Sequence, residues 1–65
     1  MAASPSNILH RALGGDGWTM STHELITCFM RAGYGVTKAK KHIQKYAEYG
    51  LIEQDSEGYW SGVDI

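Results

Sequence analysis

The sequence predicts a compact α+β fold in which three helices are followed by a C-terminal β-hairpin, all within one domain spanning residues 1–65. Three observations lead to this fold class. Apolar residues recur with a helical period as far as Gly50, and clusters of glycine separate the periodic segments. After Gly50 two short apolar segments flank a polar turn. A chain of this length has room for only one domain. It buries only about 60% of its unfolded surface, so we expect no deep substrate cavity.

The first helix is expected over about residues 5–13. Ser4 is suited to the N-cap, and Pro5 to the first helical position, where its missing N–H group costs nothing. Gly14 or Gly15 ends the helix, and Arg11 on its outer side is interpreted as solvated. The apolar face of this segment consists of Ile8, Leu9, Ala12 and Leu13.

The second helix, over about residues 22–32, has the clearest start in the chain. Ser21 and Glu24 fit a capping box, in which the serine hydroxyl and the glutamate carboxylate each accept a hydrogen bond from a backbone N–H group. Met20 precedes the cap and is placed to pack on Leu25, and Gly33 ends the helix. Residues 18–20 are too short for an independent strand, but they can add one or two hydrogen bonds to a sheet.

The third helix is expected over about residues 38–49, with Thr37 as its N-cap and Gly50 as the residue after its end. Rotation by about 100° per residue gives the helix two chemically different sides. The apolar side carries Ala39, Ile43, Tyr46 and Ala47, and the opposite side carries Lys38, Lys41, Lys45 and Glu48. His42 lies at one border between these sides and Gln44 at the other.

The β-hairpin is expected over about residues 51–63, with a four-residue turn from Asp55 to Gly58. Aspartate favours the first position of a type I turn, and glycine favours the left-handed conformation at its exit. Neighbouring side chains of a strand point to opposite faces. Tyr59 and Trp60 are therefore expected on opposite faces, with Trp60 as the exposed aromatic residue of the hairpin.

Charge is distributed unevenly, although the net formal charge is only −1. The segment between Glu24 and Glu48 contains no acidic residue and carries +5, whereas the rest of the chain carries −6. A basic stripe on one helix face is typical of a nucleic-acid-binding surface. A merely solvated helix face has the same composition, so charge alone leaves both interpretations open.

The order of the elements, together with two stretches of sequence, resembles the winged helix-turn-helix superfamily of bacterial and phage regulators. The stretch KYAEYGLIE, residues 45–53, is similar to the junction between the recognition helix and the following strand in that fold. Residues 21–25 look like the capped start of the helix that precedes the turn. The resemblance covers about residues 6–63. It implies that the third helix lies in the DNA major groove and that the hairpin is the wing.

The resemblance further implies a sequence-specific double-stranded DNA-binding protein, either a transcriptional regulator or a recombination-directing factor, that acts as a homodimer or as neighbouring copies on its site. Lysines of the third helix would neutralise phosphates or contact guanine edges, with His42 and Gln44 as further base contacts. An exposed Trp60 on the wing would contact a ligand or a partner. The expected DNA-binding residues are thus Lys38, Lys41, His42, Gln44, Lys45 and Trp60.

The hairpin departs from the usual pattern of a DNA-contacting wing because it is acidic. Glu53, Asp55 and Glu57 lie in or beside its turn, where phosphate would repel them. Two functions therefore remain open. Either the wing stays off the DNA, or the domain is a protein-protein interaction module that docks a basic partner through this acidic wing.

No motif in the chain predicts enzyme activity, a catalytic residue, a metal site or a cofactor. Cys28 lies near the apolar side of the second helix and is interpreted as structural. His23 and Cys28 point about 140° apart on a helix, so they do not form a zinc site. No apolar run exceeds three residues, and we expect a cytoplasmic protein without membrane contact.

Overall fold

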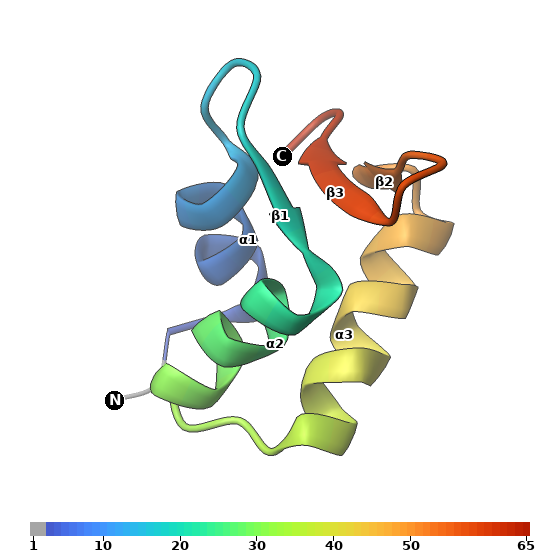
Figure 1. Ribbon diagram of the computed structural model, residues 1–65. Helices are drawn as coiled ribbons and strands as arrows, with labels where there is room; N and C mark the ends of the chain where they lie inside the picture. Colours follow the sequence, from blue (N-terminus) through green and yellow to red (C-terminus); the bar gives the residue numbers. More distant parts are fainter. Residues whose placement is uncertain (1–2) are drawn as a thin grey trace.

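The computed structural model describes residues 3–65, and within this range the chain forms three helices and a three-stranded antiparallel sheet (Figure 1). In chain order the elements are α1 (Pro5–Leu13), β1 (Thr19–Ser21), α2 (Thr22–Arg31), α3 (Val36–Glu48), β2 (Ile52–Gln54) and β3 (Tyr59–Gly62). The α+β class and the expected order of helices and hairpin are confirmed. The first two positions of the expected domain, 1–65, lie outside the described residues.

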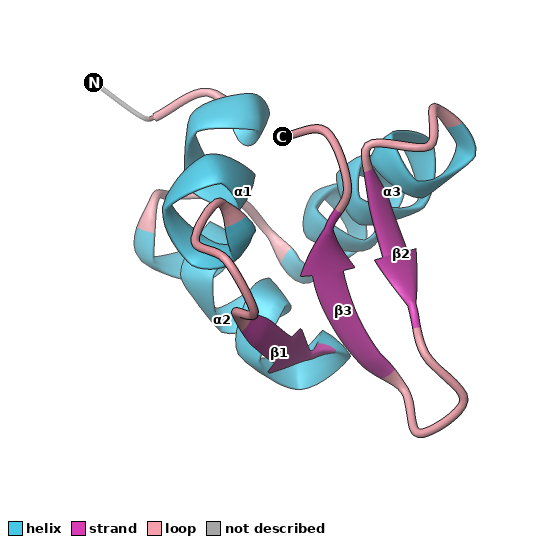
Figure 2. Cartoon of the chain, turned by 90° about the horizontal axis from the view of Figure 1, so that it is seen from above, coloured by secondary structure: helices cyan, strands magenta, loops and turns pink. Residues whose placement is uncertain are grey.

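The strands lie in the order β1-β3-β2, so the last strand of the chain is the central one (Figure 2). Met20 in β1 and Gln54 in β2 both lie opposite Trp60 in β3. The short extended segment before α2 adds a third strand to the hairpin, with three residues paired to β3 where the sequence indicates one or two hydrogen bonds. Gly58 has a φ of 92°, which agrees with the left-handed conformation expected at the exit of the turn.

The first two helices begin where their capping residues predict. The Ser4 hydroxyl accepts a hydrogen bond from the backbone N–H of Asn7 at 3.3 Å. At α2 the Glu24 carboxylate accepts from the backbone N–H of Ser21 at 3.0 Å, and the Ser21 hydroxyl accepts from that of Glu24 at 3.2 Å. Hydrogen bonds with Ser21, first of all the one from its backbone N–H, hold the pKa of Glu24 below its ordinary value.

The third helix begins two residues before its expected start, with Gly35 and not Thr37 as its N-cap. The cause is the path of the chain as it leaves α2. Gly33 adopts a φ of 99°, and the backbone N–H of Tyr34 donates to the carbonyl of Phe29 at 3.0 Å, which turns the chain sharply. Gly35 is then already extended and able to start the next helix.

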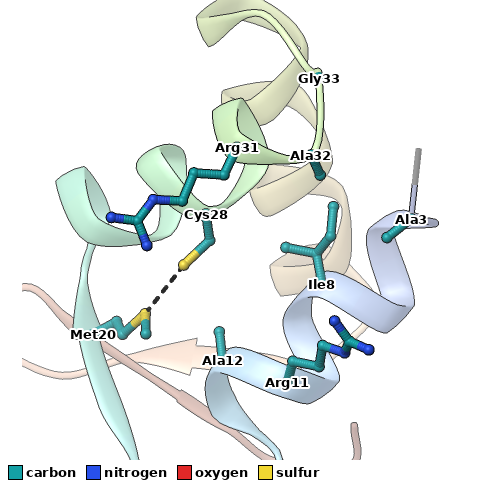
Figure 3. Close-up of a pocket in the computed structure, with 9 residues that line it drawn as sticks. All are labelled: Ala3, Ile8, Arg11, Ala12, Met20, Cys28, Arg31, Ala32 and Gly33. Carbon is teal, nitrogen blue, oxygen red and sulfur yellow. Dashed lines mark hydrogen bonds between the residues drawn. The ribbon is translucent and has the colours of Figure 1, made fainter. Parts of the chain in front are cut away.

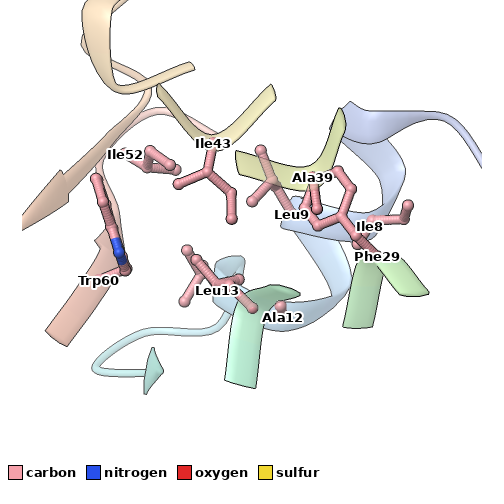
Figure 4. Close-up of a cluster of buried hydrophobic side chains, with 10 residues drawn as sticks. Ile8, Leu9, Ala12, Leu13, Phe29, Ala39, Ile43, Ile52 and Trp60 are labelled. Carbon is pink, nitrogen blue, oxygen red and sulfur yellow. The ribbon is translucent and has the colours of Figure 1, made fainter. Parts of the chain in front are cut away.

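The core lies between the three helices and the inner face of the sheet (Figure 4). Its buried residues are Ile8, Leu9, Ala12, Leu13, Leu25, Phe29, Ala39, Ile43, Ile52 and Trp60. Each helix buries residues of the face that its apolar spacing predicts, but Met30, which the spacing also places on the apolar face of α2, is 51% exposed. Phe29 of α2 and Ile43 of α3 are both in this cluster, so these two helices are held together by apolar contacts.

Trp60 is buried, and the expectation that it is the exposed aromatic residue of the hairpin is wrong. Its side chain is 9% exposed, whereas that of Tyr59 is 43% exposed. The two residues do alternate, but with the orientation opposite to the expected one. The indole Nε1–H donates a hydrogen bond to the Thr22 hydroxyl at 2.8 Å, so the polar atom of the ring is satisfied at the start of α2. Trp60 therefore attaches the hairpin to the helices and is withdrawn from the expected DNA-binding set.

Candidate nucleic-acid interface

The outer side of α3 carries a continuous set of exposed basic and polar side chains. We refer to these as the basic stripe, which consists of Lys38, Lys41, Gln44 and Lys45. Ala39 and Ile43, on the opposite side of the helix, are buried in the core. The apolar side thus fixes the orientation of α3, and the basic stripe projects into solvent as its sequence predicts.

Helical geometry keeps the members of the basic stripe close together. Around the helix axis, Lys38 and Lys45 lie about 60° and 40° from Lys41 on one side, and Gln44 lies about 60° away on the other. From Lys38 to Lys45 the stripe extends about 10 Å along the axis. No acidic residue precedes Glu48 on this helix, so most of the stripe carries uncompensated positive charge.

His42 lies at the border between the basic stripe and the core, and it is half-buried. Its imidazole stacks nearly parallel to the ring of Phe29, with 6.2 Å between centroids, and it meets the ring of Tyr34 edge-on at 5.5 Å. The hydroxyl of Tyr34 donates to the carbonyl of Ala3 at 2.9 Å, which links this aromatic cluster to the start of the chain. The structure therefore places the His42 ring in the packing between α2 and α3, although Lys38 and Lys45 lie about one turn away from it on the same helix.

The hairpin turn is acidic, but its carboxylates do not all have the same role. The Oδ1 atom of Asp55 accepts hydrogen bonds from the backbone N–H groups of Glu57 at 2.9 Å and of Tyr59 at 3.0 Å, so this carboxylate closes the turn. Glu53, Glu57 and Tyr59 are exposed, and we refer to them as the acidic turn patch. In Figure 2 the turn extends from the sheet away from α1.

A groove of about 790 Å³ lies between α1 and α2 (Figure 3). Its apolar lining includes Ile8, Met20 and Cys28, and the Sγ atom of Cys28 lies 3.9 Å from the Sδ atom of Met20. Arg11 from α1 and Arg31 from α2, both exposed, also line the groove. The sequence interpretation of Arg11 as merely solvated missed this groove, because no local pattern reports how the two helices pack.

Two further kinds of feature are absent from the part of the chain that the structure describes. Residues 3–65 contain no group of three or more histidine, cysteine or acidic side chains placed to hold a metal ion. No helix in this range is long and apolar enough to cross a membrane.

Comparison with known protein families, with curated proteins and with solved structures gives no match. What the chain binds is therefore inferred from its own geometry and charge.

Proposed function

We propose that this chain is a sequence-specific double-stranded DNA-binding protein of the winged helix-turn-helix class, acting as a transcriptional regulator or a recombination-directing factor. The basic stripe carries this proposal, because it joins three lysines and a glutamine on the one side of α3 that faces away from the core. Lysine neutralises phosphate or donates to guanine edges, and glutamine pairs with adenine. Both kinds of contact are thus available from a single helix face.

The size of α3 suits the major groove of DNA. The major groove is about 12 Å wide and about 8.5 Å deep, which admits one α-helix. With 13 residues, α3 is about 20 Å long. The basic stripe occupies about half of this length, so its side chains would meet a short run of base pairs and the phosphates that flank them.

The order and connection of the elements support the same class. Four residues, 32–35, join α2 to α3, and the β2–β3 hairpin follows α3 directly. In a helix-turn-helix domain the helix before the turn crosses the DNA backbone while the next helix enters the groove. Since Glu53 and Glu57 are exposed on the hairpin, phosphate repels it, and we infer that this wing stays off the DNA.

Salt dependence of DNA binding tests the proposal. If Lys38, Lys41 and Lys45 each neutralise one phosphate, the log–log salt slope is about −2.7, or about 40-fold weaker binding at 200 mM than at 50 mM salt. Lys41→Ala, at the middle of the stripe, should flatten the slope by about 0.9 or relax specificity at one base pair. Lys40→Ala removes the same charge about 100° away around the helix and should change binding less.

An NMR titration with duplex DNA locates the contact. We expect the resonances of α3 to shift and those of the hairpin turn to remain in place. DNA affinity that Lys41→Ala leaves unchanged at every salt concentration would contradict the proposed interface.

The acidic turn patch favours a second function, in which the domain docks a basic protein partner. In that case Glu53→Gln/Glu57→Gln abolishes partner binding, whereas Lys41→Ala has little effect. DNA then leaves the resonances of α3 unshifted even at low salt. The same titration therefore distinguishes the two functions.

A further inference from the structure

We infer that the groove between α1 and α2 is a docking site for the acidic turn patch of a second copy of this chain. The groove and the patch carry opposite charges, each combines charge with apolar surface, and they belong to different sides of the molecule. Neither includes the basic stripe, so this contact does not depend on the proposed DNA binding.

The groove has the chemistry of a site for a carboxylate that lies next to an apolar group. Arg11 and Arg31 supply guanidinium groups from two different helices, as Figure 3 shows. A guanidinium binds a carboxylate through two parallel hydrogen bonds. The lining between the arginines is apolar and includes Ile8 and Met20. None of the described residues that line the groove is acidic, so no side chain of the groove neutralises the charge of the two arginines.

The acidic turn patch has the complementary composition. Glu53 lies opposite Ser61 in the sheet, and residues two apart in a strand share a face, so Glu53 and Tyr59 project from the same face of the hairpin. Glu57 lies in the turn between the two strands. The patch therefore combines two exposed carboxylates with an exposed aromatic ring, and these are the groups that the guanidinium groups and the apolar lining of the groove can bind.

A second copy can satisfy both surfaces, whereas one molecule cannot join its own. The hairpin is fixed to the helices through Trp60, and its turn extends away from α1 (Figure 2). A net charge of −1 leaves little overall repulsion between copies. The basic stripe of α3 is the less suitable site for the patch, because its polar side chains give the ring of Tyr59 no apolar surface to bury.

The geometry of this contact decides what kind of assembly it forms. The groove of one copy receives the patch of the next, so the contact is heterologous, and repetition produces an open chain of molecules or a closed ring. A single hairpin turn buries a small area, and contacts of this size are weak and transient. In such an assembly the basic stripe of every copy stays outside the contact.

Two complementary variants test the inference. The groove variant, Arg11→Ser/Arg31→Ser, keeps its patch, and the turn variant, Glu53→Gln/Glu57→Gln, keeps its groove. All four residues are exposed, so both variants should fold, which circular dichroism melting verifies. Sedimentation equilibrium from about 10 µM to about 1 mM then measures the weight-average mass in the range suited to weak contacts.

We expect the mass of the wild type to rise above the 7.2 kDa of the monomer as concentration increases. Each variant alone should remain at monomer mass. Their equimolar mixture should associate again but stop at twice the monomer mass, because only one groove and one patch remain intact in each pair. Two control variants lose the same charges elsewhere and should associate like the wild type, namely Lys40→Ser/Lys41→Ser and Asp16→Asn/Asp64→Asn.

Three results would overturn the inference. The first is a wild-type protein that is monomeric over the whole concentration range. The second is a mixture of the two variants that stays monomeric although the wild type associates. The third is loss of association in the lysine control as complete as that in the groove variant. None of these results bears on DNA binding, which is measured separately through the basic stripe.

Discussion

Replacing Trp60 by phenylalanine measures how firmly the hairpin is attached to the helices. The indole is 9% exposed and donates to the Thr22 hydroxyl at 2.8 Å. Phenylalanine keeps one aromatic ring but removes this hydrogen bond, which contributes about 1 kcal/mol, and it leaves a cavity worth about 1 to 2 kcal/mol more. We expect Trp60→Phe to lower the free energy of unfolding by about 2 to 3 kcal/mol. For a domain of this size the melting temperature then falls by about 10–20 °C.

Trp18→Phe is the matched control, because Trp18 is 54% exposed. We expect this change to alter the free energy of unfolding by no more than about 0.5 kcal/mol in urea titrations. Each variant also leaves a single tryptophan as a fluorescent reporter. Trp60 alone should emit at shorter wavelength and resist quenching by iodide, whereas Trp18 alone should be quenched readily. Equal losses of stability in the two variants, or a readily quenched Trp60, would refute the buried position of this ring.

Three further changes test the core, a helix end and a helix start. Phe29→Ala removes a fully buried ring and should cost about 3 to 5 kcal/mol of a total stability of about 3–10 kcal/mol, so an unchanged melting temperature would contradict its place in the core. Gly50→Ala forces alanine to a φ of 78° and should lower the free energy of unfolding in urea by about 1 kcal/mol. Gly35→Ala is the control and should cost less, because Gly35 has a φ of −76° and open space surrounds the added methyl group. The pKa of Glu24 is lower in the folded chain than in the unfolded chain, so the ionised carboxylate stabilises the fold at pH values above its unfolded-state pKa. This stabilisation is lost as the pH falls through the folded-state pKa of Glu24. Glu24→Gln should therefore make the melting temperature vary less with pH on the acid side, and an unaltered pH profile would count against this role.

Signals that involve only near neighbours in the sequence predicted the starts of the first two helices correctly. The hydrogen bonds at Ser4 and in the Ser21–Glu24 capping box join residues three apart, so the residue types alone identify them. The start of α3 was misplaced by two residues because it follows from the turn after α2. That turn depends on the left-handed conformation of Gly33, which redirects the chain. The capping preference of Thr37 gives no information about this turn.

The orientation of the hairpin depends on packing that no local pattern contains. Alternation correctly separates Tyr59 from Trp60, but it does not tell which of the two faces the helices. The Thr22 hydroxyl and the apolar helix faces lie on the side of Trp60, and this becomes visible only when the sheet and helices are assembled. The basic stripe follows from helical period alone, whereas the groove beside Arg11 requires α1 and α2 to be positioned together.

The central position of β3 in the sheet prevents this domain from completing its fold before the hairpin has emerged from the ribosome. Thr19 of β1 pairs with Ser61 of β3, so β1 has no strand partner until the hairpin has left the exit tunnel. Until then the helices also lack Ile52 and Trp60, and apolar surface remains open to chaperones and proteases. Contacts between residues so far apart in the chain form slowly and late. The nascent helices are thus protected from degradation only once β3 has emerged and packed against them.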